Sequence, residues 1–160
     1  MTDTQSHTQP KYVLTLDRVL DAPVEKVWRC WTEPELLEQW FCPKPWYVTD
    51  AVMDLKPGGE FSNVMHGPDG ERVGNVGIFL AVEPMKRLVS TDAFLPGWVP
   101  AEQAFMVADT AFADAGQGRT RYIARALHWT EEAMKGHEAM GFHEGWGMAA
   151  NQLEALAKTL

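Results

Sequence analysis

Turn residues divide the chain between residues 43 and 129 into short β-type runs, and the closeness of these turns restricts the fold more than any other feature. The separating residues are mainly glycine and proline, whose backbone preferences favour turns. Parallel neighbouring strands would need crossover connections of about a dozen residues, and the segments between these runs are too short for such connections. The pattern therefore predicts six strands paired antiparallel, separated at Pro57-Gly58-Gly59, Gly67-Pro68-Asp69-Gly70, Pro84, Leu95-Pro96-Gly97 and Gly116-Gln117-Gly118.

Ahead of this region, the sequence indicates one strand and two short helices. Residues 12–20 are β-rich, with apolar and polar side chains in alternation. Asp21 and Pro23 are typical of a helix start, with Asp21 as the expected cap, and Pro34 is typical of the first turn of a second helix. The first helix has an apolar face at helical spacing, formed by Val24, Val27, Trp28 and Trp31.

The chain after Trp129 indicates two helical segments. Thr130 and the two glutamates after it suit a helix N-terminus. Four glycines between residues 135 and 147 interrupt the pattern, each costing about 1 kcal/mol against alanine inside a helix, so we expect a break near Gly141. Beyond it, a long helix shows an apolar face that only a sheet is large enough to cover: Phe142, Trp146, Ala149, Leu153, Leu156 and Leu160.

Together these elements define the α+β class. We expect a helix-grip arrangement, in which a curved antiparallel sheet of six to seven strands wraps around the long C-terminal helix and two short helices follow the first strand. We assign residues 1–11 to a disordered tail and residues 12–160 to a single domain, because 160 residues would barely supply two separate cores. Such an arrangement encloses space between the helix and the sheet.

Charge and cysteine content exclude several classes of protein. The net charge of -8 argues against nucleic acid and anionic membranes as partners, since both need clustered Lys and Arg. No apolar run is long enough for a membrane span, and residues 1–10 lack a signal-peptide pattern, so we expect a cytoplasmic protein. Cys30 and Cys42 match neither a zinc nor a redox motif and are expected to be free thiols.

The run from Arg119 to Trp129 predicts which side of the sheet faces the helix. Arg119, Arg121 and Arg125 share one face, which we expect to be solvated. The opposite face has small residues, Ala124 and Ala126, between two larger ones. We therefore expect a concave inner surface bordered by Tyr122 and His128, and we take the long interval at residues 94–102 as a candidate lid.

A small-molecule site needs apolar walls and one or two convergent polar groups. Tyr122 and His128 are the polar candidates, as anchors or as an acid and base, although a buried histidine hydrogen-bonded to a neighbour is the simpler explanation of His128. Apolar residues on the facing strands and helix are expected to line the cavity, where core packing is the simpler alternative for any one of them. These candidates are Phe61, Met65, Met106, Phe142 and Trp146.

Histidines and glutamates near the glycine-rich bend raise the alternative of a metal site. His137 and His143 are six residues apart, which places them on different faces of an ideal helix, and the H-E-x-x-H spacing is absent. We therefore expect structural or solvent-exposed histidines, no metal and no cofactor. Motifs for nucleophilic catalysis or phosphate binding are also absent from the sequence.

Several short motifs follow one another along the chain: Asp21-Ala22-Pro23, Val27-Trp28, Trp31-Thr32, Trp40-Phe41, Pro57-Gly58-Gly59 with Phe61, Glu83-Pro84 before Arg87-Leu88, and residues 141–146. In this order they resemble the SRPBCC (START-like) superfamily, and within it bacterial proteins similar to the C-terminal domain of the activator of the heat-shock-ninety ATPase. The resemblance spans Leu14 to Leu160 and implies a helix-grip fold with a hydrophobic cavity. Superfamily members bind lipids, sterols, flavonoids or polyketides, and some are cyclases or aromatases.

Three functions follow as hypotheses. The first is binding of a small hydrophobic molecule, such as a lipid, flavonoid or polyketide-like compound, in the cavity. The second is a cyclase, dehydratase or hydrolase in which His128 or Tyr122 acts as acid or base. The third is a chaperone-linked adaptor that stimulates a heat-shock ATPase through its surface, which the absence of any additional domain disfavours. A homodimer is compatible with the sequence, and no feature decides it.

Overall fold

Seven strands form one antiparallel sheet in the order β1-β9-β8-β5-β4-β3-β2. The computed structural model describes residues 9–160, so most of the predicted tail lies outside the described residues. The α+β class and the antiparallel pairing are confirmed. The strands are β1 (Val13–Leu20), β2 (Tyr47–Met53), β3 (Glu60–His66), β4 (Arg72–Glu83), β5 (Arg87–Thr91), β8 (Val107–Gly116) and β9 (Arg119–Leu127).

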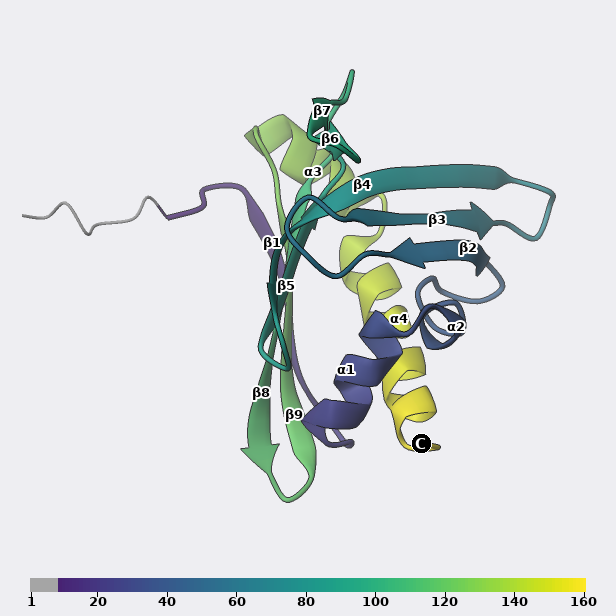
Figure 1. The fold of residues 1–160 in the computed structure, drawn as a ribbon, viewed down its shortest axis with the longest axis vertical. Helices are drawn as coiled ribbons and strands as arrows, with labels where there is room; N and C mark the ends of the chain where they lie inside the picture. Colours follow the sequence, from purple (N-terminus) through teal and green to yellow (C-terminus); the bar gives the residue numbers. More distant parts are fainter. Residues whose placement is uncertain (1–8) are drawn as a thin grey trace, which may run out of the picture.

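The sheet curves strongly, and the helices lie on its concave side. Figure 1 shows β2, β3 and β4 running across the direction of β8 and β9, so that the sheet wraps around α4. This is the predicted helix-grip arrangement. A separate small hairpin, β6 (Phe94–Leu95) with β7 (Val99–Pro100), projects at one end of the molecule. The helices are α1 (Val24–Thr32), α2 (Pro34–Leu37), α3 (Glu131–Ala139) and α4 (Phe142–Ala157).

The predicted break in the C-terminal helical region is confirmed at Gly141. This residue lies between α3 and α4 with φ 99°, in the left-handed region that glycine adopts without a steric penalty. At the other end of α3, the hydroxyl of Thr130 accepts a hydrogen bond from the amide of Ala133 at 3.0 Å, as expected for an N-cap. The break allows α3 to turn away from α4 and cover one end of the sheet.

The start of α1 differs from the prediction, because Asp21 does not cap it. Pro23 is the N-cap residue, and its carbonyl accepts hydrogen bonds from the amides of Lys26 and Val27. The carboxylate of Asp21 instead lies 3.4 Å from the ammonium of Lys158. The predicted cap was wrong because α1 begins beyond the reach of the Asp21 side chain. That side chain lies instead beside Lys158, near the end of the chain.

The two faces of β9 alternate as predicted, and the outer face has a charge cluster of its own. Burial alone would raise the pKa of the Asp109 carboxyl, but hydrogen bonds and charges from Arg87 and Arg125 hold this pKa below its usual value. The guanidinium nitrogens of these arginines lie 2.8 and 2.9 Å from the carboxylate. The arginine face is therefore partly paired across strands rather than only solvated.

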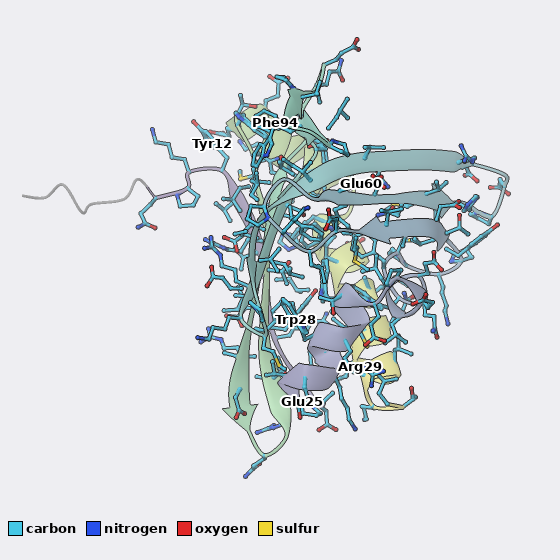
Figure 2. All side chains as sticks on the ribbon, in the orientation of Figure 1. Tyr12, Glu25, Trp28, Arg29, Glu60 and Phe94 are labelled. Atoms are coloured by element: carbon cyan, nitrogen blue, oxygen red, sulfur yellow. The ribbon has the colours of Figure 1, made fainter. Side chains whose placement is uncertain are left out.

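The main hydrophobic core joins α1, α4 and one half of the concave face. In Figure 2, Trp28 lies between α1 and the sheet, and its ring meets that of Phe112 edge-on at 5.5 Å. Cys30 and Cys42 are free, as predicted, and both are buried, which raises the pKa of each thiol to about 11. None of the helices within residues 9–160 is long and apolar enough to cross a membrane.

Candidate functional site

A cavity of about 420 Å³ lies between the sheet and α4, on the concave side of the sheet. This volume falls within the range of about 300–1,000 Å³ that small-molecule sites occupy. Its lining comes from α1, α4, six of the sheet's strands, the segment between α2 and β2, and the segment between β5 and β8.

Small side chains on the inner face of the sheet create the cavity. Ala108 on β8 and Ala124 on β9 line it, and Gly77 on β4 offers no side chain at all. Gly77 is required where it lies, since a Cβ at that position would come within 2.3 Å of the carbonyl oxygen of Thr91. The hollow is therefore fixed by residue size at these inner positions.

Four aromatic side chains form one wall of the cavity, which we call the aromatic wall: Trp31, Trp40, Phe41 and Phe61. Trp31 contacts Trp40 and Phe41 nearly edge-on, with centroid separations of 5.1 and 5.6 Å. Edge-to-face contacts of this kind stabilise aromatic clusters beyond the burial of their area. The wall is therefore held in place by its own members and needs no ligand to support it.

The hydroxyl group of Tyr122 is a buried polar group in contact with this wall. It accepts a hydrogen bond from the indole nitrogen of Trp31 at 3.1 Å. Burial raises the pKa of Tyr122, so the phenol stays protonated. Within residues 9–160 the phenolic proton finds no acceptor, although Tyr122 is only 3% exposed and lines the cavity. The site therefore contains an available hydrogen-bond donor.

Two asparagines face each other on neighbouring strands at the far side of the cavity. Asn63 on β3 and Asn75 on β4 are paired in register. The side-chain amide nitrogen of Asn75 donates to the side-chain oxygen of Asn63 at 3.0 Å. This contact leaves the amide nitrogen of Asn63 free to donate, and Asn63 is 4% exposed.

The segment from residue 93 to 106 borders the mouth of the cavity, where a lid was expected. Both side-chain oxygens of Asp92 accept hydrogen bonds from the amide of Phe105, and one also accepts from Met106. Trp98 packs against Gly58, where an added Cβ would lie 2.5 Å from the indole nitrogen. The segment is thus anchored at both sides of the opening.

Five of the seven predicted site residues line the cavity: Phe61, Met65, Met106, Tyr122 and Trp146. Phe142 does not, because it lies behind Trp146, with 4.5 Å between the ring centroids, and packs against Leu14 and Ala126. His128 is on the predicted inner face but is also outside the lining. Whether the five residues bind a ligand stays a prediction.

His128 is occupied by other contacts at the end of the sheet. Its Nδ1 lies 3.1 Å from the carbonyl oxygen of Phe105, which can only accept, so Nδ1 donates. Its Nε2 lies 3.0 Å from Nδ1 of His137 on α3. α3 therefore covers the strand end, and the simpler explanation of His128, a buried and bonded histidine, describes its position.

The histidines near the bend form two separate pairs. His137 bonds to His128, whereas His143 lies 2.8 Å from the carboxylate of Glu138 on the surface. Within the part of the chain that the structure describes, no group of three or more His, Cys, Asp or Glu side chains is placed to hold a metal ion.

The polar lining of the cavity was not predicted from the sequence, above all Asn63, Asn75 and Thr110. One signal was present. Asparagine is depleted in strands, yet both asparagines lie within β-type runs, and alternation assigns Asn63 to the same face of its strand as Phe61 and Met65. Trp31 was assigned to the apolar face of the first helix, and its contact with Tyr122 has no signature in the sequence.

Comparison with known proteins identifies the family. The model of the family described as Activator of Hsp90 ATPase homolog 1-like protein matches residues 21–158, so the chain belongs to this family. The resemblance noted in the sequence is thereby confirmed. A search of curated proteins gives no match.

Solved structures of bacterial proteins share the fold. One from Nitrosomonas europaea is 48% identical, with a TM-score of 0.89, and the match covers 92% of this chain and 95% of that one. One from Mycobacterium smegmatis is 27% identical, with a TM-score of 0.75, and covers 93% and 95%. One from Arthrobacter aurescens is 26% identical, with a TM-score of 0.79, and covers 93% and 87%.

Proposed function

We propose that this protein binds a small, largely hydrophobic molecule in the cavity between the sheet and α4. The observation that carries the proposal is the cavity itself, about 420 Å³ in volume, with an aromatic wall and a few buried polar groups. Apolar burial contributes about 25 cal/mol per Å², and the cost of association opposes it. A wall that is already assembled reduces that cost, because little reordering is needed on binding.

The proposal is tested with a neutral fluorescent probe, N-phenyl-1-naphthylamine, and a variant whose cavity is filled. Ala108→Phe places a ring in the hollow, whereas Ala111→Phe places the same ring on the outer face of the same strand. We expect wild type and the Ala111 variant to bind the probe with equal affinity, and the Ala108 variant to bind at least tenfold more weakly. Equal binding by all three proteins would place the probe elsewhere and contradict the proposal.

The acid–base alternative has less support from the geometry. Tyr122 faces the cavity, but burial raises its pKa, which favours a hydrogen-bond donor over a base. His128 is outside the lining and both its ring nitrogens are engaged. An enzyme of this kind would have to act with Tyr122 alone.

The adaptor alternative takes its support from the name of the family model. An adaptor acts through its surface and needs no cavity, so Ala108→Phe should leave it unaffected. The ATPase rate of the bacterial heat-shock-ninety homologue, measured with and without wild type and this variant, separates the two functions. Equal stimulation by both proteins would support an adaptor, and an unchanged rate would remove this alternative.

A further inference from the structure

Neutral polar side chains cross the concave face of the sheet, one from each of five neighbouring strands. The order of these strands in the sheet is β9-β8-β5-β4-β3. Every member lines the cavity, and none carries a formal charge in its ordinary state. We call this group the polar belt: Tyr122, Thr110, Ser90, Asn75 and Asn63.

The belt runs diagonally across the strands. Tyr122 pairs in register with Phe112 on β8, and Thr110 lies two residues beyond that partner on the inner face. Ser90 pairs with Ala108, which is a further two residues along β8. On β4 the partner of Ser90 is Phe79, and Asn75 lies four residues from it, directly opposite Asn63. Since side chains two residues apart share a face, the belt crosses the inner face obliquely, with its widest step between Ser90 and Asn75.

Several hydrogen-bonding groups of the belt lack partners. Thr110 is 2% exposed, and in residues 9–160 its hydroxyl group makes no side-chain hydrogen bond. The proton of Tyr122 and the amide nitrogen of Asn63 are in the same situation. Buried polar groups without partners cost stability, so an arrangement with three of them favours a ligand that supplies the missing bonds.

The charge of the lining restricts what that ligand is. Among residues 9–160, no lysine, arginine or histidine lines the cavity. Asp92 is the only charged residue that this part of the chain contributes to the lining, and its side-chain oxygens already accept hydrogen bonds from the amides of Phe105 and Met106. A buried carboxylate would find no opposite charge there, and burying an unpaired charge is strongly unfavourable.

The surface opposite the belt is apolar. Trp31, Trp40 and Phe41 of the aromatic wall, with Trp146, Ala149 and Ala150 of α4, supply flat or small apolar surfaces. Phe61, the fourth member of the wall, lies beside the belt on β3, two residues from Asn63. A ligand between the two surfaces needs an apolar face toward the rings and hydrogen-bonding atoms toward the belt. The phenol of Tyr122 stays protonated, so the atom nearest to it must accept a hydrogen bond.

We propose that the cavity selects an uncharged ring compound whose ketone or hydroxyl oxygens face the polar belt, and that it rejects carboxylates of the same size. This inference rests on the proposed function and narrows it, because it removes fatty acids and other organic anions from the candidate ligands. Tyr122 donates to a ligand oxygen, while Trp31 donates to the oxygen of Tyr122.

Three probes with the same ring system test the inference: naphthalene, 2-acetylnaphthalene and 2-naphthoate. Each is measured by displacement of N-phenyl-1-naphthylamine at pH 7. We expect the ketone to bind at least tenfold more tightly than the carboxylate. Tyr122→Phe should weaken binding of the ketone about fivefold, the effect of one hydrogen bond, and leave naphthalene unchanged. Tyr47→Phe is the matched control, since Tyr47 is exposed and outside the lining.

The outcomes separate this inference from the proposed function. If 2-naphthoate binds as tightly as the ketone, the selectivity for uncharged ligands is overturned while ligand binding in the cavity stands. If Tyr122→Phe weakens the binding of naphthalene as much as that of the ketone, the proposed hydrogen bond from Tyr122 to the ligand is overturned, while ligand binding in the cavity stands. If no probe, including N-phenyl-1-naphthylamine itself, binds to wild type, the proposed function fails and the inference fails with it.

Discussion

The filled and hollow halves of the concave face differ in residue size along the same strands. On β5, Leu88 is 3% exposed and belongs to the main core, whereas Ser90, two residues on, lines the cavity. On β8, Phe112 belongs to the core and Thr110 lines the cavity. One backbone therefore supports both a packed core and a binding space, and side-chain size alone decides which forms where.

The difference also separates stability from function. In the filled half, large side chains from the sheet, α1 and α4 remove one another from water. In the hollow half, small and polar residues contribute less stabilisation from apolar burial, and some of their hydrogen-bonding groups are unpaired. We interpret the hollow half as the part of the protein whose sequence serves a ligand. The following predictions test this contrast.

The largest effect is expected in the filled half. Phe112→Ala removes a ring that packs against Trp28 and Tyr122, and we expect the free energy of unfolding to fall by about 3–5 kcal/mol. Urea denaturation measures it. Ala108→Phe in the hollow half is the counterpart, expected to change stability by less than about 1 kcal/mol because space for the ring already exists. A similar loss of stability in both variants would contradict the proposed difference between the filled and the hollow half.

The second prediction concerns pH and the histidine pair that lies beyond the cavity. Burial and the neighbouring His128 lower the pKa of His137 to about 4, against about 6.5 in an unfolded chain. As the pH falls below about 6.5, the unfolded chain takes up this proton first. Stability present above that pH is therefore lost between about pH 6.5 and 4, by up to about 1.4 kcal/mol per pH unit.

Two asparagine variants isolate this pH effect. His137→Asn keeps a hydrogen-bonding atom near Nε2 of His128 but removes the titrating ring, so the slope of stability between pH 6.5 and 4 should flatten. His143→Asn is the control, since His143 is exposed and bonds to Glu138 on the surface. If the stability of the His137 variant falls between pH 6.5 and 4 as steeply as that of wild type, another group controls the acid sensitivity.

The smallest effect comes from two threonines on neighbouring strands. The hydroxyl group of Thr120 donates to the carbonyl oxygen of Ala22 at 2.7 Å, so Thr120→Val should cost about 1–2 kcal/mol. Thr110 makes no such bond to any residue from 9 to 160, and Thr110→Val should leave stability unchanged or slightly raised while weakening the binding of 2-acetylnaphthalene. An equal loss of stability in both variants would mean that the polar belt serves the fold rather than a ligand.

The alternation of β9 and the break at Gly141 could be predicted because both depend on local rules, the period of a strand and the conformational freedom of glycine. The position of His128 could not. Alternation places it on the inner face, but α3 covers that end of the strand, and where a helix folds back is decided by tertiary packing.

The candidate site could be predicted from the sequence to about the same extent as the fold. Phe61, Met65, Tyr122 and Trp146 could be predicted to line the cavity because periodicity indicates their elements and faces. Met106 also lines the cavity, although it lies just before β8 rather than within a strand. The pairing of Asn63 with Asn75 depends on the register of two strands, and the bond from Trp31 to Tyr122 joins residues that are far apart in the chain. Contacts of this kind leave no pattern in a single sequence.

The most direct test of ligand binding is a crystal structure of the protein with 2-acetylnaphthalene. The account predicts the ring system between the aromatic wall and the sheet, with the ketone oxygen about 3 Å from the hydroxyl oxygen of Tyr122. A ligand bound only on the outer surface, with Trp146 or its neighbours filling the space between α4 and the sheet, would contradict it.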